Sequence, residues 1–93
     1  MRVVAGSARG RRLQTPPGLD VRPTTDRVRE ATFNALGSLD VVEGATVLDL
    51  FAGSGALGIE ALSRGAEHVT FVDNSSRALA AVRDNLATCD LEP

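Results

Sequence analysis

From residue 45 onward, the spacing of hydrophobic positions along the chain switches three times between a strand period and a helix period. Short apolar runs rich in β-branched residues predict strands, and the longer stretches between them fit helices. The predicted elements are a strand at residues 46–50, a helix near 56–64 ended by Gly65, a strand at 68–72 and a helix from about Ser75 to Cys89. This order predicts an α/β fold with a parallel sheet and a right-handed crossover.

Residues 1–14 carry a different pattern. Two short apolar runs, Val3–Ala5 and Leu13, lie on either side of the segment Gly6–Gly10, which predicts a small β-hairpin with an arginine-bearing turn. The prolines of Thr15–Gly18 mark its end, because proline removes a hydrogen-bond donor from a strand ladder.

A helix is predicted between the hairpin and the first strand. Thr24, Thr25 or Asp26 can cap its N-terminus, and its pattern continues to about Leu39. Apolar spacings of three and four predict the buried faces of this helix and of the last one. The first face comprises Val28, Ala31, Thr32, Ala35, Leu36 and Leu39, and the last helix presents Leu79, Val82 and Leu86.

Composition adds an electrostatic asymmetry. The chain has 93 residues, enough for at most one small domain, and a formal net charge of −2. Residues 1–30 hold seven arginines against three acids, whereas residues 31–93 hold three arginines against nine acids. The basic N-terminal end predicts an anionic partner.

Several classes of protein are disfavoured by the sequence. No apolar run approaches the ~20 residues of a membrane span, and no apolar core of a signal peptide follows the N-terminus. Cys89 has no second cysteine with which to pair, which fits a reducing cytoplasm. His68 has no neighbouring His or Cys, so we interpret it as a strand-edge residue, not a metal ligand. A cytoplasmic protein without a metal site is expected.

The strongest chemical signal follows the first predicted strand. Gly53, Gly55 and Gly58 form a Gly-x-Gly-x-x-Gly motif between a strand and a helix, the context of a nucleotide-binding loop. Asp49 lies inside the strand before the motif, and Asp73 ends the second strand, twenty residues after Gly53. The alternative for the three glycines alone is a tight turn with close helix–strand packing.

The two acids narrow the identity of the ligand. Asp73 stands where a carboxylate accepts ribose hydroxyls, which fits both NAD and S-adenosylmethionine. Asp49 favours S-adenosylmethionine, because that cofactor has an ammonium group that a carboxylate can hold and NAD has none. Amides around Ser54 can meet nearby polar groups of the ligand. Asp73 can instead cap the following helix, and Asn74 is equally compatible with a place beside the adenine or with capping.

The sequence resembles the bacterial 16S ribosomal RNA guanine-N2 methyltransferases. The resemblance rests on Arg2–Gly6, Arg9–Arg11, Arg22–Glu30 with Phe33 and Asn34, Asp49–Gly55 and Val72–Asp73, and it covers essentially the whole chain. It implies the first part of a Rossmann-like class I methyltransferase fold that uses S-adenosylmethionine to methylate the exocyclic N2 of a guanine in small-subunit RNA. Two regions are expected: a basic RNA-binding hairpin at 1–22 and an incomplete cofactor-binding domain at 23–93.

The resemblance also places individual residues. It puts the segment Thr24–Arg29 over the cofactor pocket, so Thr25 and Arg29 join the expected cofactor ligands. Arg27 and Arg29 can instead pair with Asp26 or Glu30 along their helix. Arginines expected to contact 16S rRNA or the small ribosomal subunit are Arg2, Arg9, Arg11, Arg12 and Arg22, against the alternative that they form a solvated face.

One family motif is absent. Members carry Asp/Asn-Pro-Pro-Tyr/Phe downstream of these strands, and the only Pro-Pro here lies in Thr15–Gly18. No catalytic residue is therefore assigned in residues 1–93, and this stretch alone is expected to be inactive. A non-catalytic RNA-binding or cofactor-binding module is the alternative function, and half of an NAD-dependent oxidoreductase is a third. The free edges of two central strands favour association, which leaves the oligomeric state open.

Overall fold

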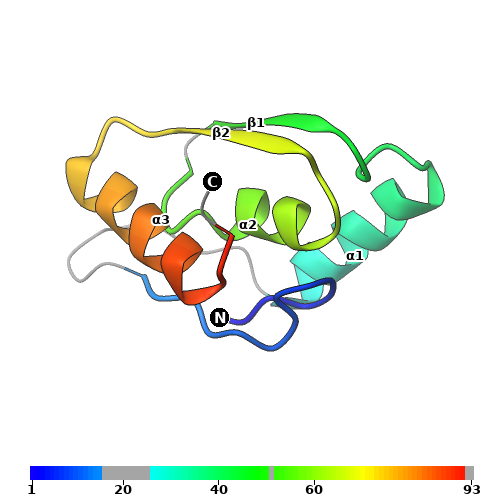
Figure 1. Ribbon diagram of the computed structural model, residues 1–93, viewed down its shortest axis with the longest axis horizontal. Coiled ribbons are helices and arrows are strands. Elements are labelled where there is room, and N and C mark those ends of the chain that lie inside the picture. The colour runs from blue at the N-terminus through cyan, green and yellow to red at the C-terminus, as the bar shows by residue number, and fades with distance from the viewer. Residues whose placement is uncertain (16–25, 51, 92–93) are drawn as a thin grey trace.

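The structure is a computed structural model in which residues 1–15, 26–50 and 52–91 are described (Figure 1). It confirms the predicted order of helices and strands. Regular elements are α1 (Asp26–Ser38), β1 (Thr46–Leu50), α2 (Ala56–Ser63), β2 (His68–Val72) and α3 (Ser76–Thr88). Among these helices, none is long and apolar enough to cross a membrane.

The two strands are paired in parallel. Thr46 lies opposite His68, and the register continues to Leu50 opposite Val72. The carboxyl ends of both strands therefore meet at one end of the sheet, where the chain turns into α2 and α3 (Figure 1). In open parallel sheets this end is where ligands bind.

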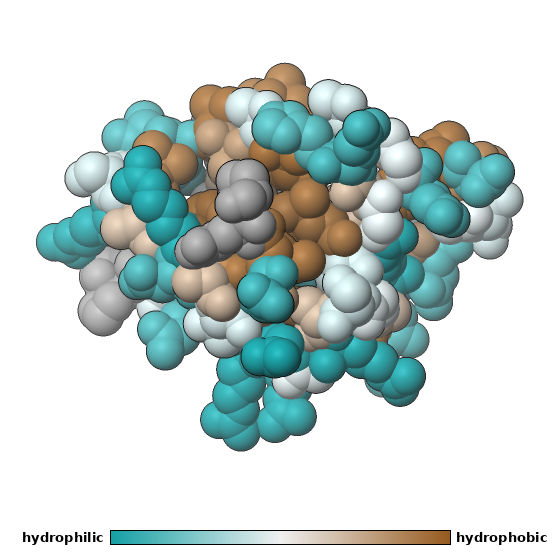
Figure 2. Space-filling model, viewed as in Figure 1, coloured by the Kyte–Doolittle hydropathy of each residue, from teal (hydrophilic) through white to brown (hydrophobic). Residues whose placement is uncertain are grey.

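All three helices lie on one side of the sheet, and residues 1–14 pass beneath them (Figure 1). Alternate strand residues consequently differ in burial. Val69 is buried on the helix side, whereas Leu48, Leu50 and Val72 are exposed. Apolar side chains gather over the strands at the top of Figure 2. The described chain thus covers one face of its sheet and leaves part of the other open.

Residues 1–14 form the predicted hairpin. Its arms are joined by an antiparallel bridge between Arg2 and Arg12 and by backbone bonds such as Val3 N–H to the Arg11 carbonyl, 2.9 Å. Pairing is limited to this bridge, so the arms are not regular strands. The hairpin shares the protein core, because its buried side chains Val3, Ala8 and Leu13 pack with Ala56, Ile59 and Cys89.

The predicted buried face of α1 is wrong. Val28 and Leu39 are 53% and 70% exposed, and the buried residues are Arg29 and Phe33. The predicted Ala31, Thr32 and Ala35 are also exposed, and Leu36 is half-buried. The helix packs on α2 along a narrow stripe that includes a charged partner for Arg29, which apolar spacing could not indicate.

The predicted face of α3 is partly confirmed. Val82 is buried and Leu79 and Leu86 are half-buried, but Asn85 is 1% exposed and occupies the most enclosed polar position of the helix. Ser75 caps the N-terminus by accepting a bond from the amide of Ala78. A buried asparagine on this stripe needs partners from elsewhere in the fold.

Candidate functional site

The glycine motif begins after β1 and extends into α2, and its three glycines have different structural roles. Gly53 and Gly55 have φ of 57° and 84°, in the left-handed region that favours glycine. At Gly58 the conformation is helical, but a Cβ would overlap the ring of Phe71. The packing alternative is therefore confirmed for Gly58, whereas Gly53 and Gly55 shape the loop itself.

Asp73 lies against this loop. Its Oδ2 accepts the Gly53 amide proton at 2.9 Å, and its Oδ1 accepts the Ser75 amide proton at 2.9 Å. These two bonds, that of Gly53 above all, hold the pKa of the Asp73 carboxyl below its ordinary value. The carboxylate therefore remains ionised, and its two oxygens have lone pairs left for further donors.

Asp49 is the buried acid of the site. It is 7% exposed, and its Oδ2 accepts the Gly58 amide proton at 3.1 Å, near the start of α2. Burial raises the pKa of the Asp49 carboxyl; the Gly58 amide opposes this, and the charge of Asp73 adds to it. A cavity of about 200 Å³ adjoins this carboxyl, lined by Thr32, Phe33, Leu36, Val47, Leu48, Leu57 and Gly58.

The structure brings most of the predicted cofactor residues to one end of the sheet. Ser54 is buried in the loop, and Asn74 is exposed directly after Asp73. Thr25 lies outside the described residues. Arg29 lies in the described part, where it bonds to Glu60, to Asp26 and to the Arg2 carbonyl. The gathered set is Asp49, Gly53, Ser54, Gly55, Gly58, Asp73 and Asn74.

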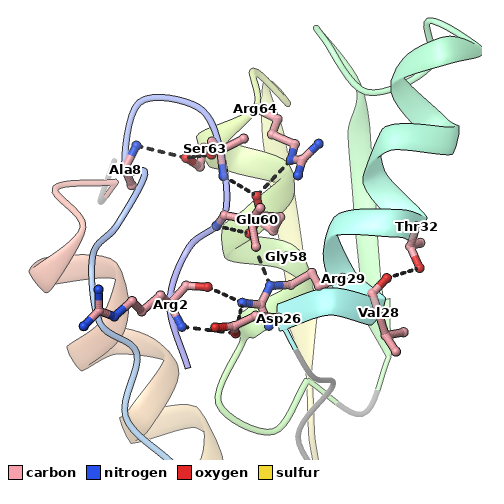
Figure 3. Close-up of polar contacts among 12 residues, drawn as sticks. Arg2, Ala8, Asp26, Val28, Arg29, Thr32, Gly58, Glu60, Ser63 and Arg64 are labelled. Carbon is pink, nitrogen blue, oxygen red and sulfur yellow. Dashed lines mark hydrogen bonds and ion pairs between the residues drawn. The ribbon is translucent and has the colours of Figure 1, made fainter.

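Glu60, on α2, is the centre of a second cluster (Figure 3). The carboxylate is fully buried; Oε1 accepts from the Val4 amide at 2.8 Å and Arg29 Nε at 3.2 Å. Oε2 accepts from the Ala5 amide at 3.0 Å and Arg64 Nε at 2.8 Å. Burial alone would raise the pKa of Glu60, but these four bonds outweigh it and hold the pKa below the ordinary 4.5.

Arg29 extends this cluster to the hairpin and to the start of α1. Its Nη2 donates to the carbonyl of Arg2 and to Asp26 Oδ1, the latter at 2.7 Å. The alternative pairing of Arg29 with Asp26 is thus confirmed. Arg29 as a cofactor ligand stays a prediction, and its described bonds instead join three segments of the protein.

Ser63 fixes the turn of the hairpin one helical turn beyond Glu60. Its Oγ accepts the Ala8 amide proton at 2.9 Å and donates to the Ala5 carbonyl at 2.6 Å. Its carbonyl accepts the Ser7 amide proton at 2.8 Å. Gly6, with φ of 92°, lies so close that a Cβ there would overlap the Ser63 carbonyl. The turn of the hairpin is consequently held on α2 by hydrogen bonds to the side chain and carbonyl of Ser63.

The hairpin arginines predicted to meet RNA are exposed. Arg2, Arg9, Arg11 and Arg12 all have solvent-accessible side chains, and Arg22 lies outside the described residues. Arg11 also donates to the Thr88 carbonyl at 3.0 Å. This exposure is compatible with RNA contact and with a solvated face.

Sequence reasoning missed three buried polar residues: Glu60, Ser63 and Asn85. A weak signal was present for two of them. Glu60 interrupts the apolar run Ile59–Leu62, and Asn85 follows Val82 at helical spacing on the buried stripe. Several of their partners are backbone groups of the hairpin, which no side-chain motif reveals. No group of three or more potential metal ligands occurs in the described residues.

Two parallel strands, a glycine loop after the first and an acid directly after the second define part of a Rossmann-like α/β domain. The chain belongs to the family described as Conserved hypothetical protein 95, whose model matches residues 1–93. This confirms the predicted relationship, since the relatives below include small-subunit rRNA methyltransferases.

Two curated relatives and one solved structure illustrate the family. "Putative rRNA methyltransferase YlbH" of Bacillus subtilis is 53% identical over 98% of this chain and 48% of its own length. "Ribosomal RNA small subunit methyltransferase D" of Escherichia coli K12 is 48% identical over 95% of this chain and 43% of its own length. The structure of "Putative methyltransferase yhhF" from Escherichia coli is 49% identical with a TM-score of 0.82, over 97% of this chain and 48% of that one. The chain thus spans about half the length of the curated relatives it matches.

Proposed function

We propose that residues 1–93 bind S-adenosylmethionine at the glycine loop and present a basic hairpin to small-subunit ribosomal RNA, as part of an enzyme that methylates the exocyclic N2 of a guanine. The observation that carries the proposal is the placement of two carboxylates about one loop. Asp73 bonds the amide of Gly53, and Asp49 bonds the amide of Gly58.

The donor set fits this cofactor. Asp73 is ionised, and its free lone pairs can accept two vicinal ribose hydroxyls. Asp49 is buried with a raised pKa, so a cationic ammonium nearby would favour its charged form. Gly53 and Gly55 have no Cβ, so a ligand at the loop would meet backbone there and no side chain. NAD would leave the buried acid Asp49 without a cationic partner.

In the proposed reaction, the cofactor supplies an electrophilic methyl group on its sulfonium. The described residues bind and orient the cofactor, because Asp73 fixes the loop while Asp49 sets a negative charge at its other side. Positioning a weak nucleophile such as the guanine amine in line with that methyl is the main task left to the rest of the site. Residues 1–93 contain no acceptor motif of the Asp/Asn-Pro-Pro-Tyr/Phe type.

Titration with S-adenosylmethionine and, in parallel, with NAD tests the proposal. Calorimetry is expected to show saturable binding of S-adenosylmethionine and none of NAD. Preferential binding of NAD would reject the proposed function in favour of the oxidoreductase reading. Methyl transfer from labelled cofactor to deproteinised or subunit-bound RNA is expected to be absent with residues 1–93 alone. Turnover in that assay would require a catalytic site among residues not assigned here.

Replacing Arg9, Arg11 and Arg12 together by glutamine should weaken RNA binding and leave cofactor affinity unchanged. If each arginine neutralises one phosphate, the slope of log K against log salt should shrink by about 0.7–0.9 for each lost contact. Filter binding over a series of salt concentrations measures this slope. Arg83→Gln, an exposed arginine on α3, is the control. Equal slopes for the triple variant and the parent would show that these arginines are solvated and do not contact RNA phosphates.

Asp49→Asn should stabilise the protein at neutral pH and weaken cofactor binding. Burial raises the pKa of Asp49, so its ionisation costs folded stability as the pH rises above the ordinary 3.8. Asparagine keeps an oxygen for the Gly58 amide but removes the charge, so Tm should rise by a few degrees. Affinity for S-adenosylmethionine should fall about 10-fold, the loss of one charge-assisted bond.

Thermal unfolding and calorimetry of the same Asp49→Asn sample check both parts, with Asp40→Asn, an exposed acid, as the control. A variant that is less stable than the parent would show that the ionised carboxylate is needed for the fold. Unchanged cofactor affinity would show that Asp49 does not bind the ammonium group of the cofactor.

A further inference from the structure

One buried amide joins the hairpin to the glycine loop. Asn85 of α3 is 1% exposed, and its Oδ1 accepts the Gln14 amide proton at 2.9 Å. Its Nδ2 donates to the Gln14 carbonyl at 2.9 Å and to the Ser54 carbonyl at 2.9 Å. The last part of the hairpin and the middle of the loop, 40 positions apart in sequence, therefore share one side chain.

These three hydrogen bonds fix the orientation of the Asn85 side-chain amide. Both hydrogens of the amide are used, and its oxygen has a donor, so the planar group cannot turn without losing a bond in a buried place. A shift of the Ser54 carbonyl must then be followed by Asn85 and by the backbone at Gln14. Densely packed interiors transmit such shifts.

The rest of the hairpin is held independently of Asn85. Glu60 and Ser63 bind its first arm and its turn to α2, and Arg11 reaches the Thr88 carbonyl one turn after Asn85. The exposed arginines Arg9 and Arg12 lie between these anchors and Gln14. The orientation of the basic surface thus depends on the α2 anchors at one side and on Asn85 at the other.

We propose that Asn85 is a positioning residue that couples RNA binding at the hairpin to cofactor binding at the loop. This inference rests on the proposed function. A cofactor that orders Gly53–Gly55 also fixes the Ser54 carbonyl, and through Asn85 it orders the second arm of the hairpin before RNA arrives. RNA then binds a surface that is already ordered, so each ligand raises the affinity for the other by the same factor.

The test compares RNA affinity with and without saturating S-adenosylhomocysteine, a cofactor product that cannot donate a methyl group. With a small-subunit rRNA transcript, the parent chain should bind RNA about 5-fold more tightly when the nucleoside is present, at the low end of typical couplings. Asn85→Asp keeps the shape and the acceptor for Gln14 but places an oxygen against two carbonyls. It should reduce the effect below about 2-fold, whereas Asp84→Asn, the reverse exchange on the exposed neighbour, should leave it intact.

A second variant guards against loss of folding. Gln14→Pro removes the amide proton that Asn85 accepts and leaves the bonds of Asn85 to the Gln14 and Ser54 carbonyls in place. It should retain cofactor affinity and weaken the coupling. A coupling factor in Gln14→Pro equal to that of the parent would overturn the inference. So would a parent chain that binds both ligands without mutual effect, an outcome that leaves the proposed function standing. A parent chain that binds neither ligand would reject both.

Discussion

Glu60→Ala is expected to lower the free energy of unfolding by about 3–5 kcal/mol, a large part of the stability of a small domain. The carboxylate is fully buried between the guanidinium groups of Arg29 and Arg64 and the amides of Val4 and Ala5. Truncation leaves buried charge and buried amide protons without their acceptor, which is the costly way of breaking such a cluster. Denaturant unfolding followed by circular dichroism measures the change.

Two further variants separate the causes. Glu60→Gln keeps the size and one acceptor oxygen, so it should cost less than alanine if packing contributes and as much if charge alone matters. Glu30→Ala, an exposed helical glutamate, should change stability by no more than about 0.5 kcal/mol. A Glu60→Gln variant as stable as the parent would show that the negative charge does not hold the hairpin on α2.

Acid titration of stability offers an independent readout. Because the folded pKa of Glu60 lies below the ordinary 4.5, the contribution of its charge is complete above that pH and is lost as the pH falls through the lowered pKa. Glu60→Gln should therefore lose more stability at pH 7 than at acid pH, relative to the parent. An equal difference at both pH values would contradict this assignment.

Asp73→Asn is expected to weaken S-adenosylmethionine binding about 10- to 100-fold, since bonds to a charged acceptor contribute roughly 1.5–3 kcal/mol. The side chain can keep one acceptor for the amide of Gly53 or Ser75, but its second oxygen becomes a donor facing another amide. The variant therefore loosens the loop and removes the charge that the ribose hydroxyls would meet. Calorimetric titration of folded protein measures the loss.

Asp90→Asn is the matched control for this exchange. Asp90 is exposed after α3 and has φ of 56°, a conformation that asparagine adopts as readily as aspartate. It should leave cofactor affinity unchanged. If Asp73→Asn also left the dissociation constant unchanged while lowering Tm, Asp73 would serve only to cap α3 and to hold Gly53.

The geometry of the glycine loop could be predicted from sequence because its signals are local. Gly53 and Gly55 take left-handed backbone conformations, and Asp73 follows an apolar strand whose carboxyl end must lie beside them in a parallel sheet. The same reasoning failed for α1. Apolar spacing selected Val28 and Leu39 as buried residues. The fold instead buries Arg29, because the carboxylate of Glu60 on α2 neutralises its charge.

The sequence by itself determined the order of helices and strands, the parallel pairing, the glycine loop and the two acids beside it, since each follows from local residue spacing or from the order of the elements. Only the tertiary structure decided that the basic hairpin is part of the core and that Glu60, Ser63 and Asn85 hold it. Those side chains bind backbone groups 55 to 71 positions away. Backbone amides and carbonyls are the same at every residue, so a sequence pattern cannot show which of them a buried side chain will meet.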